Sequence, residues 1–164
     1  MKFLGIDPGT TRIGYGLIED KSGNFSAIKY GLLKLDALKR NGAVGVGGAF
    51  LKLIKKTGPD VIAIEELFFT KNQKTAISVA ESRGVMKYLS LKNNFTVREY
   101  NPLEVKLALT GDGRADKISV AKMVKKIFSL EKIKGPDDVS DALAIALTAA
   151  MRYKMDSLQI DGSR

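Results

Sequence analysis

Carboxylate side chains stand at the ends of several apolar segments of the sequence. Asp7 directly follows the first apolar segment of the chain, and Glu65 directly follows the apolar run 61–64. Asp138 and Asp141 lie three residues apart, so they share one face at the start of a predicted helix. Carboxylates that are brought together repel one another unless a cation neutralises them. The four acids therefore indicate a site for hard divalent cations that bind oxygen ligands. Such a set of carboxylates is typical of sites where two magnesium ions support phosphoryl transfer.

Each of these acids also has an ordinary structural explanation. Asp before Pro8-Gly9 is a common opening of a turn, and an acid at a helix N-terminus compensates the helix dipole. Three acids, at positions 137, 138 and 141, go beyond what capping needs, because neighbouring carboxylates are costly without a cation. Capping also leaves unexplained why Asp7 and Glu65 both follow predicted strands.

The composition excludes several kinds of chemistry. The 164 residues include neither Cys nor His, which excludes disulfides, thiol nucleophiles, catalytic triads that contain histidine, and the usual zinc sites. The formal net charge of +9 favours a polyanionic partner such as a nucleic acid, although a solubilising surface is an equal alternative. No apolar segment is long enough to span a bilayer and no signal-peptide cleavage pattern follows Met1, so we expect a cytoplasmic protein.

Apolar patterning predicts the elements that must hold these acids in place. Strands are predicted over residues 3–6, 13–18, 24–35, 61–64 and 95–100. Helices are predicted over residues 37–56, 73–91 and 137–151. A short helix is also predicted from residue 102, and another helix follows the loop 111–117 and runs to about residue 130. If the first and fourth strands are neighbours in one sheet, Asp7 and Glu65 lie side by side at carboxyl ends, where α/β sheets place ligands. The last helix then needs only to bring Asp138 and Asp141 to the same point.

Three segments carry further features. Four glycines between residues 42 and 48 each cost a helix about 1 kcal/mol relative to Ala, so only the second half of the segment 37–56 is expected to be helical. The helix over residues 73–91 has two apolar arcs, and the second arc indicates either a partner subunit or a wide core-facing surface. Residues 155–164 are polar and are expected to form a C-terminal tail.

Two places along the chain are candidates for nucleic-acid contacts. Phe68, Phe69 and Lys71 combine aromatic rings with a cation, which suits base stacking beside a phosphate, although one ring is expected to plug the core instead. Arg114 and Lys117 stand at a helix entry in the most basic part of the chain, where they can meet a phosphate. A solvated helix face explains most of the other charges there.

Several motifs together resemble the RuvC family of Holliday-junction resolvases. They are Gly5-Ile6-Asp7-Pro8-Gly9-Thr10, Ala63-Ile64-Glu65, Lys71-Asn72, Ser82-Arg83-Gly84 and Asp138-Val139-Ser140-Asp141-Ala142-Leu143-Ala144-Ile145-Ala146. Each motif is weak alone. Their order and spacing over nearly the whole chain make the set specific.

The resemblance implies an α/β protein with an RNase H-like fold, in which a mixed five-stranded sheet has helices on both faces. A single domain would cover residues 1–154. The resemblance also implies a homodimer, joined through the helix over residues 73–91, that resolves four-way DNA junctions in recombination and repair. The branch-migration proteins RuvA and RuvB would be its partners.

The family's functional residues can be carried over position by position. The catalytic and metal-binding carboxylates would be Asp7, Glu65, Asp138 and Asp141. They would hold two Mg²⁺ ions, for which Mn²⁺ can substitute, and hydrolysis would leave 5′-phosphate and 3′-hydroxyl ends. Lys106 and Lys117 match basic positions around the scissile phosphate, and Phe68 matches an aromatic that stacks at the junction. Some members carry His where this chain has Asp138, so a His-dependent mechanism cannot operate here.

Three other functions agree with parts of the sequence. The opening Asp-Pro-Gly-Thr-Thr resembles the phosphate loop of actin-like ATPases and sugar kinases, which need two domains and therefore more than 164 residues. A nuclease family of ribosomal RNA maturation shares a similar opening but is usually shorter. A junction-binding protein without catalysis is the third alternative, and it would bind DNA without magnesium and cleave nothing.

Overall fold

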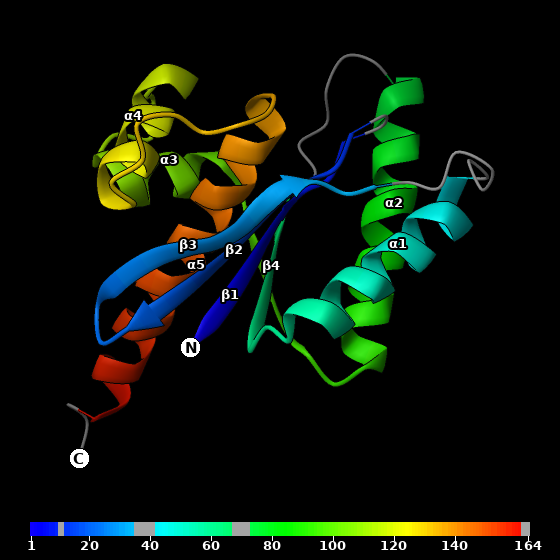
Figure 1. Cartoon of the computed structure of the whole chain (residues 1–164), viewed down its shortest axis with the longest axis horizontal. Helices are drawn as coiled ribbons and strands as arrows, with labels where there is room; N and C mark the ends of the chain where they lie inside the picture. The colour runs from blue at the N-terminus through cyan, green and yellow to red at the C-terminus, as the bar shows by residue number, and fades with distance from the viewer. Residues whose placement is uncertain (10–11, 35–41, 67–72, 162–164) are drawn as a thin grey trace.

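A computed structural model describes residues 1–9, 12–34, 42–66 and 73–161, which form one sheet with helices on both of its faces (Figure 1). The strands are β1 (Lys2–Asp7), β2 (Gly14–Lys21), β3 (Asn24–Leu32), β4 (Val61–Glu65) and β5 (Thr96–Tyr100). The helices are α1 (Gly42–Thr57), α2 (Gln73–Lys92), α3 (Pro102–Thr110), α4 (Lys117–Ile127) and α5 (Asp137–Asp161). The predicted order of strands and helices along the chain is confirmed.

The sheet is mixed, and its order is β3-β2-β1-β4-β5. β1 runs antiparallel to β2 and parallel to β4, with Ile6 opposite Ile64. The two strands therefore end at the same edge of the sheet, and the acids that follow, Asp7 and Glu65, come out side by side. This arrangement confirms the predicted neighbourhood of the first and fourth strands.

Helix α5 packs across β1 and β2 and forms the centre of one half of the core. Its residues 142–150 are almost completely buried, because the helix is apolar on nearly every side. Glycines in the two strands allow this close approach: a Cβ at Gly5 would collide with the carbonyl oxygen of Ala142, and a Cβ at Gly14 with that of Asp138. The same contacts hold the acidic start of α5 at the edge where β1 ends.

Helices α1 and α2 pack on the opposite face of the sheet, over a second apolar cluster that includes the fully buried Phe50 and Met86 (Figure 1). α1 is helical from Gly42 onward, so the expectation of a helix only in the second half of its segment is wrong. The reason is packing against α2: a Cβ at Gly47 would lie 3.2 Å from the side chain of Val85. Glycine lets the two helices approach closely, and this contact outweighs its low helix propensity.

The connections and ends of the helices add local detail. Asn101 and Glu104 form a capping box at the start of α3, in which each side chain accepts a hydrogen bond from the other residue's backbone N–H. α5 continues to Asp161, through most of the segment for which a polar tail is predicted. The division of the chain at residue 154 stays a prediction. Within the part of the chain that the structure describes, no helix has the length and apolar character needed to cross a membrane.

We expect Gly5→Ala to destabilise the protein by about 3 kcal/mol, because the new Cβ meets the backbone of α5, which cannot move aside without shifting the helix. Gly48→Ala is the matched control: Gly48 lies in α1 with nothing near its missing Cβ, so Ala should stabilise the protein by about 1 kcal/mol. Urea unfolding of both variants tests the contact. Equal stabilities would contradict the role of Gly5.

Candidate active site

Three of the four predicted acids line one cavity at the carboxyl edge of the sheet. Asp7 ends β1, Glu65 ends β4, and Asp141 lies in the second turn of α5. They line a cavity of about 260 Å³ together with Lys106 from α3 and Lys117 from α4. We call this space the acid cavity.

Asp138, the fourth acid, lies beside this cavity and does not line it. Its negative charge nevertheless contributes to raising the pKa of Asp7. Its carboxylate faces Arg12, with Nε 3.6 Å from Oδ2. The structure therefore gathers all four acids in one region, with Asp138 at its border.

The electrostatics of the acid cavity favour a bound proton or a bound cation. Burial, above all, raises the pKa of the Asp7 carboxyl from 3.8 to about 7. The neighbouring carboxylates raise the pKa of Asp7 further, in the order Glu65, Asp141, Asp138, whereas the Lys117 ammonium lowers it. Burial also raises the pKa of Glu65, followed by the charge of Asp141. Asp7 therefore keeps its proton to a higher pH than an ordinary aspartate does.

Among the described residues, Lys117 supplies the one positive charge that directly contacts a carboxylate group of this cavity. Its Nζ donates a hydrogen bond of 2.9 Å to Asp141 Oδ2, and this bond raises the pKa of Lys117. Lys117 is the first residue of α4, and the N-cap Asp116 fixes that end of the helix by accepting a hydrogen bond from the Ser119 N–H. The ammonium is thus held in front of the acids by local helix geometry.

The donor set fits a divalent cation, although the side chains are not arranged around one. Asp7, Glu65 and Asp141 offer only carboxylate oxygens, which magnesium and manganese prefer. As they are placed, no three acidic side chains in the described part of the chain converge closely enough to share a metal ion. The Lys117 ammonium occupies Oδ2 of Asp141, and the other oxygen of this carboxylate has no hydrogen-bond or ion-pair partner among the described residues.

The other predicted contact residues separate into three groups. Lys106 and Lys117 line the acid cavity, as their predicted position beside a scissile phosphate requires. Arg114 precedes α4, where its backbone N–H donates to Asp112, and it does not line this cavity. The remaining candidates lie outside the described residues: Phe68, Phe69 and Lys71.

Arg83 has a role at the site that the sequence did not reveal. From α2, its Nε donates to the backbone oxygen of Glu65 at 3.0 Å, and its Nη2 contacts Glu99 Oε1 at 2.6 Å. Lys87, one turn further along α2, also pairs with Glu99. The end of β4 is therefore held by α2 and β5. The spacing of Arg83 and Lys87 on one helix face was the available signal, but their common partner on β5 depends on the sheet order.

Comparison with known proteins gives matches along nearly the whole chain. A family model described as "Crossover junction endodeoxyribonuclease RuvC" matches residues 3–149. A curated protein of that name from Caldicellulosiruptor saccharolyticus is 47% identical over 150 residues, which cover 90% of each chain. Another, from Caldanaerobacter subterraneus, is 44% identical over 156 residues, again 90% of each chain.

Solved structures confirm the predicted RNase H-like fold. The RuvC structure from Thermus thermophilus is 31% identical, with a TM-score of 0.83, and the match covers 95% of this chain and 97% of that one. T. thermophilus RuvC in complex with a Holliday junction substrate gives a TM-score of 0.86 at 31% identity, over 95% and 96% of the two chains.

The raised pKa of Asp7 predicts how stability depends on pH without divalent metal. Between about pH 4 and pH 7 the folded protein keeps a proton on Asp7 that the unfolded chain has lost, so stability should fall as pH rises through this range. The loss should be about 2–4 kcal/mol. Asp7→Asn removes the charge, so this variant should be more stable than the wild type at pH 8 in EDTA and closer to it at pH 4.

Urea unfolding in EDTA across this pH range measures the difference. Glu81→Gln is the control, because Glu81 is an exposed acid on α2 and its removal should leave the pH slope unchanged. An Asp7→Asn variant with the wild-type slope would show that Asp7 titrates normally.

Proposed function

Because the chain belongs to the RuvC family of crossover junction endodeoxyribonucleases, we propose that it is a structure-selective endonuclease that resolves four-way DNA junctions in recombination and repair. The observation that carries this proposal is the acid cavity. Asp7, Glu65 and Asp141, from three separate elements, meet at the carboxyl edge of the sheet in a chain that the RuvC model matches nearly from end to end.

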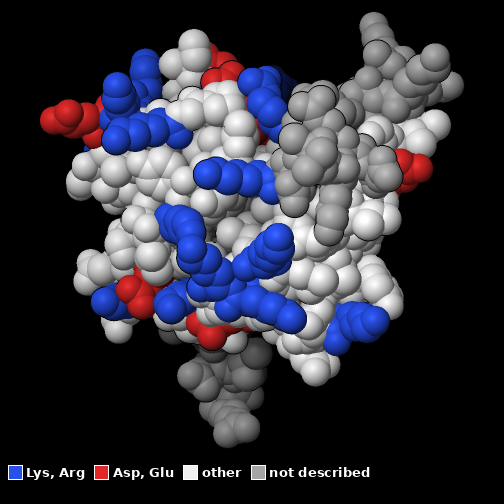
Figure 2. Space-filling view, turned by 45° about the vertical axis from the view of Figure 1, so that its right-hand side comes forward, with Lys and Arg blue, Asp and Glu red and all other residues white. Residues whose placement is uncertain are grey.

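The charge of the surface supports a polyanionic substrate. Figure 2 shows Lys and Arg side chains gathered across one face of the molecule, with few acidic side chains among them. The net charge of +9 has the same sign. Such a surface attracts the phosphate backbone at long range and orients it without reading base sequence.

The residues of the site have distinct proposed roles. Asp7, Glu65, Asp138 and Asp141 would hold divalent cations, with magnesium as the expected metal and manganese as a substitute. Two bound ions would lower the pKa of the attacking water and neutralise the departing 3′ oxygen, leaving 5′-phosphate and 3′-hydroxyl ends. Arg83 fixes the end of β4 and thereby the position of Glu65. Lys106 and Lys117 would offset the charge that develops on the phosphate.

Cutting a junction symmetrically requires two copies of the site, and α2 offers a surface for pairing. Ile77, Tyr88 and Leu91 are 61%, 59% and 54% exposed. Their spacing places them on one side of α2, opposite the buried Met86 that faces the core. This exposed apolar stripe supports the proposed homodimer through α2. Partnership with RuvA and RuvB and a cytoplasmic location stay predictions.

Each acid can be tested by an isosteric substitution on a synthetic four-way junction. Glu65→Gln should slow cleavage by roughly 10³-fold or more, since it removes a metal-binding charge at the reacting phosphate. Asp7→Asn, Asp138→Asn and Asp141→Asn should have effects of the same order. Glu66→Gln is the matched control, because Glu66 is the exposed neighbour of Glu65 and lies outside the acid cavity, so the variant should cleave normally.

Cleavage products on a denaturing gel, with magnesium or with EDTA, give the readout. Paired, magnesium-dependent nicks in the junction and none in a linear duplex are the expected result. Junction binding without cleavage would indicate a binding protein, and cleavage of structured RNA alone would indicate the ribosomal RNA nuclease activity.

The proposed dimer gives a separate prediction. Tyr88→Glu places a charge in the exposed stripe of α2, so the protein should sediment as a monomer and lose paired cleavage. Val44→Glu is the control, because Val44 is 75% exposed on α1 and lies outside the stripe. A Tyr88→Glu protein that remains a dimer would exclude this surface as the interface.

A further inference from the structure

A second cavity, of about 210 Å³, opens beside the acid cavity between α4 and the start of α5. The two cavities share Lys117 and Asp141 in their linings and therefore adjoin each other. The α4 side of the second cavity also carries Ile118, Lys122 and Lys125. These three residues stand at positions i, i+4 and i+7 and therefore form one face of the helix.

The charges around this second cavity are only partly paired. Lys117 pairs with Asp141, whereas neither Lys122 nor Lys125 takes part in an ion pair with any described residue. The only other acid of the lining is Asp137, which is exposed at the start of α5. The lining of this cavity therefore carries three lysines and two acids, so positive charge exceeds negative charge. A small anion would correct this imbalance.

Ser140 gives an independent sign that a partner is missing. Its residue lines the second cavity, and its hydroxyl oxygen is buried without a hydrogen-bond partner among the described residues. Buried hydroxyl groups are normally paired with protein or ligand atoms. The hydroxyl oxygen is closed off as the side chains are placed, so a phosphate oxygen would accept its hydrogen once the neighbouring side chains turn aside. This contact would lie at the N-terminal end of α5, where negative charge is favoured.

Ile118 adds the last feature of this cavity. Its side chain is 65% exposed at the first turn of α4, beside the lysines. A sulfate ion or a metal ion gains nothing from contact with an apolar side chain. A DNA strand does, because each phosphate is followed by a deoxyribose ring with an apolar face. The combination of lysines, a hydroxyl group and an apolar side chain matches one nucleotide of backbone.

We propose that this second cavity binds the backbone phosphate directly next to the scissile phosphate in the cleaved DNA strand. Lys122 and Lys125 pair with that phosphate, Ser140 donates a hydrogen bond to it, and Ile118 contacts the adjoining sugar. The inference rests on the proposed nuclease function, because the acid cavity must hold the scissile phosphate for its neighbour to fall here. The contact fixes the register of the strand, so that one particular phosphate lies at the acids.

A phosphate-replacement experiment tests the contact. Junctions that carry one neutral methylphosphonate at successive positions around the cut are cleaved by the wild type under single-turnover conditions with magnesium. One replacement directly beside the cut should raise the junction concentration for half-maximal cleavage about tenfold. The variant Lys122→Gln/Lys125→Gln should show a similar increase with ordinary DNA, and the methylphosphonate should then add little.

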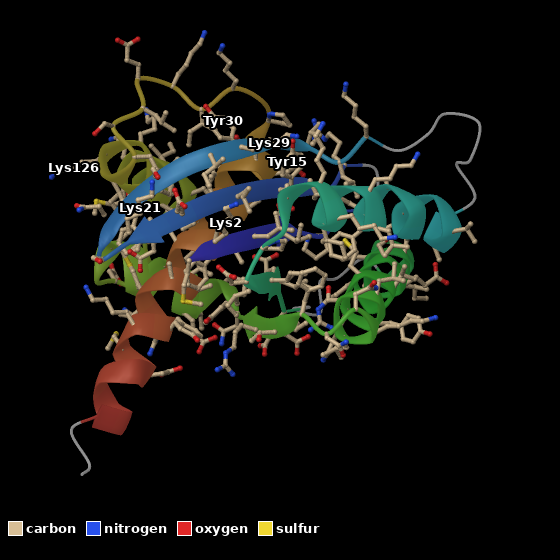
Figure 3. The ribbon with its side chains drawn as sticks, turned by 60° about the horizontal axis from the view of Figure 1, so that its bottom comes forward. Lys2, Tyr15, Lys21, Lys29, Tyr30 and Lys126 are labelled. Carbon is tan, nitrogen blue, oxygen red and sulfur yellow. The ribbon has the colours of Figure 1, made fainter. Side chains whose placement is uncertain are left out.

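Lys29→Gln/Lys126→Gln is the matched control for the loss of two charges. Lys126 is the exposed neighbour of Lys125 on α4 and Lys29 lies on β3, and neither lines the cavity (Figure 3). In this control variant the methylphosphonate should keep its full tenfold effect. Equal methylphosphonate effects in the wild type and in Lys122→Gln/Lys125→Gln would overturn the inference while leaving the nuclease function intact. A wild type that cleaves no junction would overturn the proposed function itself, and the inference with it.

Ser140→Ala separates binding from folding. Removal of an unpaired buried hydroxyl should leave the melting temperature unchanged or raise it. The same change should raise the junction concentration for half-maximal cleavage several-fold, since a phosphate contact is lost. A lower melting temperature with unchanged junction binding would show that Ser140 has only a structural role.

Discussion

The burial of several carboxylates in one cavity, increased in cost by their mutual repulsion, is the constraint on which this site depends. Parallel pairing of β1 and β4 brings Asp7 and Glu65 together, and α5 adds Asp141 to the same cavity. Such a group is unfavourable unless protons or cations neutralise it. Without metal, a proton on Asp7 and the ammonium of Lys117 partly meet this need. Metal ions that bind here would therefore replace the proton on Asp7.

The fold maintains this arrangement by close packing away from the acids. Gly5 and Gly14 allow α5 to lie directly on β1 and β2, which brings the start of the helix to the sheet edge. On the opposite face, Arg83 reaches from α2 to the backbone of Glu65. The repelling groups are thus held by contacts from both layers of helices. The packed core therefore supplies the stability that offsets the unfavourable burial of the acids.

The structure has the predicted fold and brings the four predicted acids into one region, because strand ends and helix starts are local features of the chain. The roles of these acids in metal binding and catalysis stay predictions. The helical state of α1 could not be predicted in the same way. Glycine has a low helix propensity, and the reason for Gly47 in this helix is its close packing against Val85 of α2, which the local sequence does not show. The partnership of Arg83 with Glu65 and Glu99 was missed because it joins three elements whose order in the sheet is not encoded locally. The unpaired Ser140 hydroxyl was likewise invisible, since only three-dimensional burial reveals it.

Calorimetric titration with Mn²⁺, without DNA, tests the central claim most directly. If a metal ion replaces the proton on Asp7, binding at pH 6 should release close to one proton per chain, and binding at pH 8.5 should release almost none. Buffers with different ionisation enthalpies measure this release. Asp7→Asn should abolish it and weaken binding, whereas Glu66→Gln should preserve both. Metal binding with no proton release at pH 6, or binding that is unaffected by Asp7→Asn, would contradict the account.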